Sequence, residues 1–77
     1  MTSLRKIKDR LEDIVEEIVS GGIFWSEAVS QFEKLFILRV LRESNGNLGK
    51  AAKIMGVHRN TLSKKIRKYT IRKRPAG

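Results

Sequence analysis

Apolar residues in the first quarter of the chain follow the spacing of an amphipathic helix. They recur at alternating intervals of three and four residues, with charged residues between them: Leu4, Ile7, Leu11, Ile14 and Ile18. Ser3 stands before the first of these residues and can cap a helix that begins at Leu4. Gly21 and Gly22 then interrupt the pattern, so we predict that the helix ends there.

A second helix is predicted to begin near Trp25, with Ser26 as its N-cap and Glu27 in its first turn. Its apolar residues form one stripe and also occupy other faces: Val29, Phe32, Phe36 and Val40 in the stripe, and Leu35, Ile37, Leu38 and Leu41 elsewhere. A helix that is apolar on most sides must be buried on most sides. We therefore expect one face to pack within the chain and another to pack on a second copy, because Phe36, Ile37 and Val40 cannot all be covered within one small chain. The alternative is that the other three helices cover the second helix.

Two short helices are predicted in the C-terminal third of the chain. Gly46 suits the left-handed position after a helix, and Asn47 can cap the next helix, over residues 48–55. Gly56 permits a tight turn, and a fourth helix follows from about His58 to Tyr69. Its inner face is anchored by Leu62, Ile66 and Tyr69.

These two helices have the spacing of a helix-turn-helix. Such a unit needs a small residue where the helices cross, and Ala52 supplies it. It also needs a residue that tolerates positive φ at the turn, and Gly56 lies four positions later. Val57 and Leu62 are the apolar residues that would fix the angle between the helices. The predicted fold class is all-α, with four helices.

Length and charge limit the architecture and the kind of partner. The chain has 77 residues, no cysteine and one histidine, so we expect a single domain without disulfides or a zinc site. Residues 1–44 hold seven Lys and Arg and all eight acidic residues, for a net charge of −1. Residues 45–77 hold the other ten basic residues and no acid, for a net charge of +10. Such a segment indicates a polyanionic partner, either nucleic acid or an anionic membrane, although a solubilising basic face is the alternative.

Two classes of function fit this charge. One is a DNA-binding regulator or architectural protein, and the other is an interaction module whose basic helix docks on an acidic protein or an anionic membrane. A membrane-binding helix would carry bulky apolar residues beside its lysines, whereas Leu62, Ile66 and Tyr69 are already needed for the core. RNA is less favoured because no exposed aromatic platform is evident. No apolar run is long enough for a membrane span, so we expect a soluble, intracellular protein.

Two segments also resemble a known family. "GNLGKAAKIMGVHRNTLSKKIRKY", residues 46–69, is similar to the C-terminal helix-turn-helix of the Fis family, which also ends activators of the NtrC type. "FEKLFILRVLRESNGN", residues 32–47, is similar to the long dimerisation helix of that family. The resemblance implies a bacterial homodimer in the cytoplasm, associated with the nucleoid. Its first two helices would form a dimeric four-helix core, and it would regulate transcription or bend DNA.

The resemblance implies roles only for residues that match. Arg59 matches an arginine that reaches a base edge, and Thr61 and Lys64 match positions that contact phosphate. Asn60 is similar to the NtrC-type version. The departures from Fis are His58 in place of an asparagine, Ser63 in place of a second base-reading arginine, and Gly49 in place of a phosphate-binding Thr or Ser. The DNA sequence preference of the family therefore does not carry over.

The predicted segments are 1–44 for dimerisation, 45–71 for DNA binding and 72–77 as a disordered basic tail. The expected DNA-binding residues are His58, Arg59, Asn60, Thr61, Ser63, Lys64, Arg67, Lys68, Lys50 and Lys53. The expected dimerisation residues are Phe32, Phe36, Ile37, Val40, Leu41, Ile14 and Ile18. We expect no catalytic residue, metal, cofactor or small-molecule substrate. Met1 leads directly into the first helix, which favours a free-standing regulator over a domain excised from a larger activator.

Overall fold

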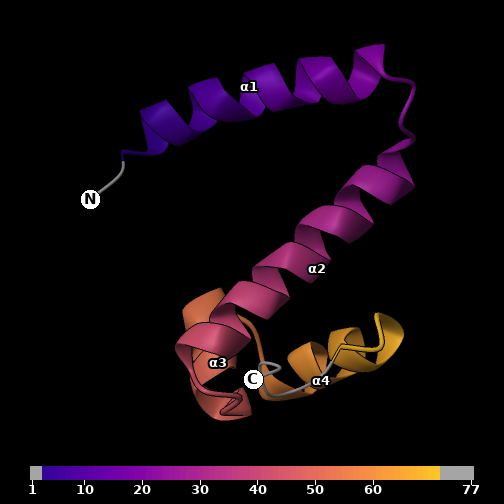
Figure 1. The fold of residues 1–77 in the computed structure, drawn as a ribbon. Coiled ribbons are helices and arrows are strands. Elements are labelled where there is room, and N and C mark those ends of the chain that lie inside the picture. Colours follow the sequence, from indigo (N-terminus) through magenta and orange to yellow (C-terminus); the bar gives the residue numbers. More distant parts are fainter. Residues whose placement is uncertain (1–2, 72–77) are drawn as a thin grey trace. The chain divides into compact units, whose positions relative to one another are not determined.

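The computed structural model describes residues 3–71, and this part of the chain contains helices joined by turns, without strands (Figure 1). The helices are α1 (Leu4–Ser20), α2 (Trp25–Glu43), α3 (Leu48–Met55) and α4 (Arg59–Lys68). The predicted all-α class is therefore confirmed. Met1 and the predicted basic tail, residues 72–77, lie outside the described residues.

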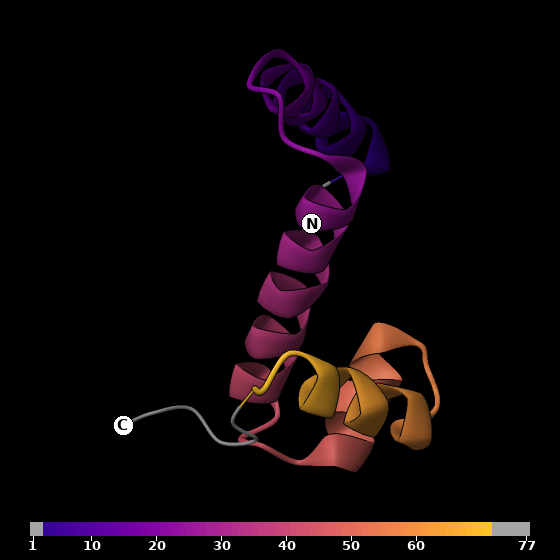
Figure 2. The same ribbon diagram turned by 90° about the vertical axis from the view of Figure 1, so that its right-hand side faces the viewer.

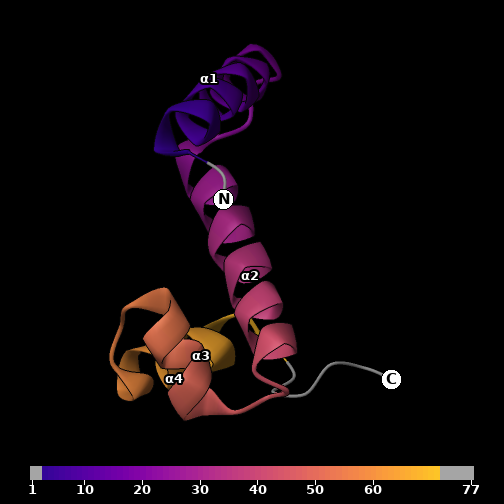
Figure 3. The same cartoon turned by 90° about the vertical axis from the view of Figure 1, so that its left-hand side faces the viewer.

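The chain divides into two compact units, residues 1–30 and residues 31–77. The C-terminal part of α2 belongs to the same unit as α3 and α4. In that unit, α3 and α4 both lie beside the C-terminal end of α2 (Figures 2 and 3). The end of the predicted dimerisation helix is thus part of the fold that supports the helix-turn-helix.

Residues next to the helices set several of the helix ends through hydrogen bonds or backbone angles. Ser3 Oγ accepts a hydrogen bond from the Lys6 amide at 3.3 Å, which confirms the predicted cap of α1. Asn47 Oδ1 likewise accepts from the Lys50 amide at 3.1 Å and caps α3. Gly56 follows α3 with φ 72° and ψ 30°, the left-handed conformation that glycine adopts without steric cost.

The predicted start of α2 near Trp25 is confirmed, but its predicted N-cap is wrong. The first helical bond runs from the Ala28 amide to the Phe24 carbonyl at 3.1 Å, and α2 begins at Trp25. Ser26 therefore lies in the first turn and cannot act as the N-cap, because a cap must precede the first helical residue.

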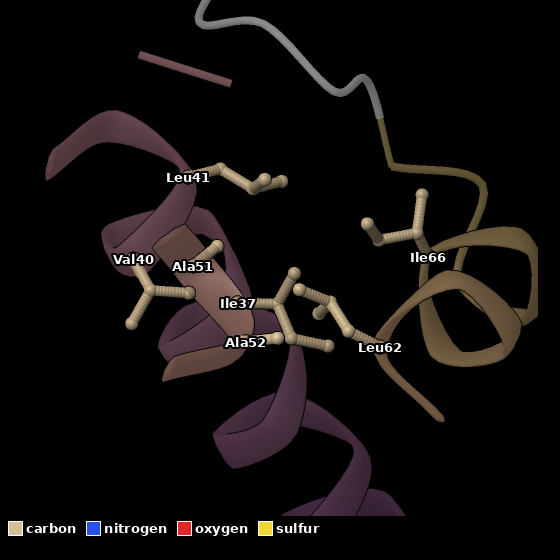
Figure 4. Packing of buried hydrophobic residues seen from close by; sticks show 7 residues of the cluster. All are labelled: Ile37, Val40, Leu41, Ala51, Ala52, Leu62 and Ile66. Atoms are coloured by element: carbon tan, nitrogen blue, oxygen red, sulfur yellow. The ribbon is translucent and has the colours of Figure 1, made fainter. Parts of the chain in front are cut away.

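One apolar core holds the C-terminal unit together. It is formed by side chains from three helices: Ile37, Val40 and Leu41 of α2, Ala51 and Ala52 of α3, and Leu62 and Ile66 of α4. Figure 4 shows Ile37, Ala52 and Leu62 pointing toward one another. The small side chain of Ala52 lets the helices approach closely, as predicted for the crossing of α3 and α4, and Val57 packs at the edge of this core.

Three of the predicted dimerisation residues lie in the core of a single chain. Ile37, Val40 and Leu41 are buried within a single chain, with Ile37 0% exposed. They need no second copy, because α3 and α4 cover this face of α2. Of the three residues that were expected to be too many for one chain to cover, Ile37 and Val40 are covered within the chain and Phe36 is left 42% exposed.

A second apolar face of α2 remains exposed. Phe32, Leu35 and Phe36 are 58%, 63% and 42% exposed. At about 100° per residue, these side chains lie on the side of α2 away from Ile37 and Leu41. Phe32 and Phe36 lie one turn apart, with their ring centroids at 5.9 Å. The helix therefore has two distinct apolar faces, and one chain covers one of them.

The N-terminal unit has its own exposed apolar stripe. No residue of α1 is fully buried, and the large apolar side chains that are exposed on it are Leu4, Ile7, Leu11, Ile14, Val15 and Val19. Ile18 is half-buried. Charged residues fill the rest of the helix surface, including an exposed Lys8–Glu12 pair at 2.8 Å.

Candidate nucleic-acid interface

The turn before α4 fixes where the predicted recognition helix begins. His58 is the N-cap of α4, and its Nδ1 atom accepts a hydrogen bond from the Asn60 amide at 3.0 Å. The helix therefore starts at Arg59, one residue later than predicted. Arg59 and Asn60 occupy its first turn, and both side chains are exposed. In helix-turn-helix proteins the first turn of the second helix approaches the bases.

The outward face of α4 is polar and basic. Asn60, Lys64 and Arg67 are exposed, on the side of the helix opposite to the buried Leu62 and Ile66. At about 100° per residue, an inner face formed by Leu62 and Ile66 places these three side chains on the opposite side of the helix. Thr61 and Lys68 are also exposed, whereas Ser63 is half-buried.

Helix α3 adds two cations to the same unit. Ala51 and Ala52 pack into the core, while Lys50 and Lys53 are exposed on the other side of α3. All ten predicted DNA-binding residues thus fall within the described part of the chain. Nine of them are exposed, and Ser63 is the exception. Their contacts with DNA stay a prediction.

One basic residue of α4 is neutralised within the chain. Lys65 Nζ donates a hydrogen bond to Glu33 Oε2 of α2 at 2.5 Å. The positive charge of residues 45–77 was predicted to have no compensation within the chain, and for Lys65 that prediction is wrong. Within residues 3–71, the other salt bridges are Lys8–Glu12 and Arg39–Glu43, which involve no residue of α3 or α4.

The Glu33–Lys65 pair favours the charged form of both groups. The hydrogen bond from Lys65 lowers the pKa of the Glu33 carboxyl, and the same bond raises the pKa of the Lys65 ammonium. The Tyr69 hydroxyl lies near enough to Glu33 to add to the lowering of its pKa. Its geometry does not meet that of a hydrogen bond, however, and among the described residues the hydroxyl is buried without a partner.

Sequence reasoning missed Glu33 because it lies 32 residues from Lys65. The position of Lys65 on α4 could have indicated a partner within the chain, because Lys65 lies beside the buried face of the helix and not on its outward face. Lys68 also has a neighbour in the chain, since its Nζ atom lies 5.3 Å from the centroid of the Tyr69 ring, within the range of a cation–π contact.

No helix in the part of the chain from residue 3 to residue 71 combines the length and the apolar character that a membrane span requires.

A family model described as bacterial regulatory protein, Fis family, matches residues 28–69, which is more than half of the chain. The matched region includes most of α2, all of α3 and α4, and the core between them. The resemblance found in the sequence is therefore confirmed. No curated protein and no solved structure matches the chain.

Proposed function

This chain belongs to the Fis family of bacterial regulatory proteins, and from that premise we propose that it is a homodimeric transcriptional regulator or DNA-bending factor that places α4 in the major groove. The observation that carries the proposal is the exposed basic surface of the helix-turn-helix. Its cations that lie outside any ion pair with another described residue are Lys50, Lys53, Arg59, Lys64, Arg67 and Lys68. Like charges gathered in this way need a polyanion.

The apolar residues of α4 favour DNA over a membrane surface. Leu62 and Ile66 are the two aliphatic residues in this helix, and both are buried in the core. The exposed face of α4 therefore offers charge and hydrogen-bonding groups but no bulky apolar group that could insert into a bilayer.

Different exposed residues of α4 suit different contacts with DNA, either with base edges or with phosphates. Arg59 stands in the first turn, where a guanidinium can donate two hydrogen bonds to guanine O6 and N7. Thr61 and Lys64 follow on the exposed side of α4, where a hydroxyl and an ammonium can bind phosphate oxygens. The Nδ1 atom of His58 accepts the hydrogen bond from the Asn60 amide, so the Nε2 edge of the ring is the part that is available to DNA.

Replacing Arg59 with Ala tests this function. The variant is expected to lose about 1–3 kcal/mol of binding free energy at a specific site and to relax the preference at one base pair. Lys64→Ala is the matched comparison and is expected to weaken specific and random DNA about equally. Competition binding with a selected site and a random duplex, at one salt concentration, measures both effects. If Arg59→Ala lost the same affinity for both duplexes, Arg59 would not be a base-reading residue.

The exposed apolar surfaces support a homodimer. Phe32, Leu35 and Phe36 form a face of α2 that the chain's own core does not use, and α1 carries the exposed stripe that includes Ile14. A small chain without disulfides gains stability by burying such surfaces against a second copy. We therefore assign Phe32 and Phe36 to the dimer contact and remove Ile37, Val40 and Leu41 from it.

We further propose that the dimer bends DNA and associates with the nucleoid. A two-fold dimer reaches successive major grooves of straight DNA only if its recognition helices lie about 34 Å apart. A compact dimer with a closer spacing must bend the duplex, and flexible pyrimidine–purine steps are favoured at the bends. Gel mobility of one binding site placed at different positions along a fixed fragment is expected to vary with position. Constant mobility would contradict the bend.

A further inference from the structure

The Glu33–Lys65 pair lies between the helix that carries the apolar faces and the predicted recognition helix. We propose that Glu33 is a positioning residue that holds Lys65 away from DNA phosphate and thereby limits the affinity of the chain for DNA of any sequence. This inference rests on the DNA-binding function proposed above. It goes beyond that function by giving Glu33, an acidic residue of α2, the role of withdrawing one cation of α4 from the DNA interface.

Lys65 lies where it could reach phosphate if it were free. On α4 it follows Thr61 by four residues and precedes Lys68 by three, so the three side chains share one flank of the helix. Thr61 and Lys68 are both exposed. An unpaired ammonium between them would extend the row of groups available to a phosphate strand.

Glu33 instead holds that ammonium at the edge of the core. Glu33 precedes Ile37 by one helical turn, and Ile37 is buried against α3 and α4. The two charged side chains are 25% and 34% exposed, whereas those of the Arg39–Glu43 pair are 68% and 52% exposed. A partly buried pair is screened less by salt than a surface pair. Both groups are charged at neutral pH, and the lowered pKa of Glu33 and the raised pKa of Lys65 widen the pH range over which the pair stays charged.

Each cation that neutralises a phosphate releases bound counterions. In a plot of the logarithm of the binding constant against the logarithm of the salt concentration, each such contact makes the slope more negative by about 0.9. Glu33→Gln keeps the size and shape of the side chain but removes the charge that holds Lys65. The variant is expected to bind a random duplex several-fold more tightly at low salt. Its log–log salt slope should steepen by about 0.9 per protomer. A merely structural role for Glu33 would lower stability without steepening the slope.

Glu43→Gln is the matched control. It removes the same charge from the same helix, but Glu43 pairs with Arg39 at 3.0 Å and has no ion pair with α4. We expect its salt slope to equal that of the natural chain. Adding Lys65→Gln to Glu33→Gln should remove the extra steepness, because the freed ammonium is its source.

The outcomes separate this inference from the proposed function. If the natural chain binds no duplex DNA at low salt, both are overturned. If it binds DNA and Glu33→Gln has the same slope as Glu43→Gln, only the role of Glu33 is overturned. Should Glu33→Gln fail to fold, the single variants decide: Lys65→Gln is expected to leave the slope unchanged and Lys64→Gln to reduce it. An equal reduction by both would show that Lys65 already binds phosphate.

Discussion

Replacing Phe36 with Asp is expected to give a folded monomer, whereas replacing its neighbour Ile37 with Asp is expected to unfold the chain. The two side chains leave α2 on different faces. Phe36 is 42% exposed and belongs to the face proposed for the dimer, while Ile37 is 0% exposed and packs in the core of the helix-turn-helix. Aspartate at position 36 can be solvated in a monomer but would place an unpaired charge in a dimer contact.

The cost at position 37 is large enough to decide the outcome. Truncating a buried isoleucine typically costs about 2–5 kcal/mol, and a buried charge without a partner adds to this. The total is comparable with the stability of a small domain, about 5 kcal/mol at the low end of the usual range. No side chain of the core carries a charge that could offset the aspartate, because all seven buried core residues are aliphatic.

Circular dichroism and sedimentation at micromolar concentration measure the two effects. The natural chain is expected to sediment as a dimer, Phe36→Asp as a helical monomer, and Ile37→Asp as a chain that has lost most of its helix signal. Lys34→Asp, at an exposed position on the same helix, is the control for a new charge on the surface of α2. A natural chain that is a stable folded monomer would contradict the dimer, and a helical Ile37→Asp variant would contradict the core.

Features that depend on neighbouring residues could be predicted from the sequence. Ser3, Asn47 and Gly56 act through hydrogen bonds or backbone angles within a few residues of their own position, so their residue types were sufficient. The spacing of Leu62 and Ile66 fixed the inner face of α4 for the same reason. Asn60, Lys64 and Arg67 could be assigned to the outward face of α4 because an exposed face follows directly from a buried one.

Features that depend on distant parts of the chain could not be predicted in this way. The apolar pattern of α2 shows that it has more than one apolar face, but it does not show which face α3 and α4 cover. Ile37 and Phe36 are adjacent and both apolar, and only the packed structure separates their roles. Glu33 and Lys65 were missed for a similar reason, because charge was summed by segment and the pair joins two segments.

Affinity for DNA is expected to fall steeply with salt. If each protomer neutralises about four phosphates, chiefly through Lys50, Lys53, Lys64 and their neighbours, a dimer gives a log–log slope near −7, at about −0.9 per phosphate. Thr61 would position the duplex without adding to the slope, because it carries no charge, and Lys65 adds nothing while Glu33 holds it. Between 50 and 200 mM salt, this slope corresponds to a loss of affinity of about 10⁴.

The same measurement reports how many protomers bind. Fluorescence anisotropy of a labelled random duplex, titrated at several salt concentrations, gives the slope directly. Phe36→Asp, if it is a folded monomer, should bind with a slope near −3.6, because one protomer neutralises about half as many phosphates. The ratio of the two slopes then depends on assembly and not on the number of phosphates assumed for each protomer. A slope shallower than about −3 for the natural chain would leave too few phosphate contacts for even one protomer, and the exposed cations of α3 and α4 would need a different partner.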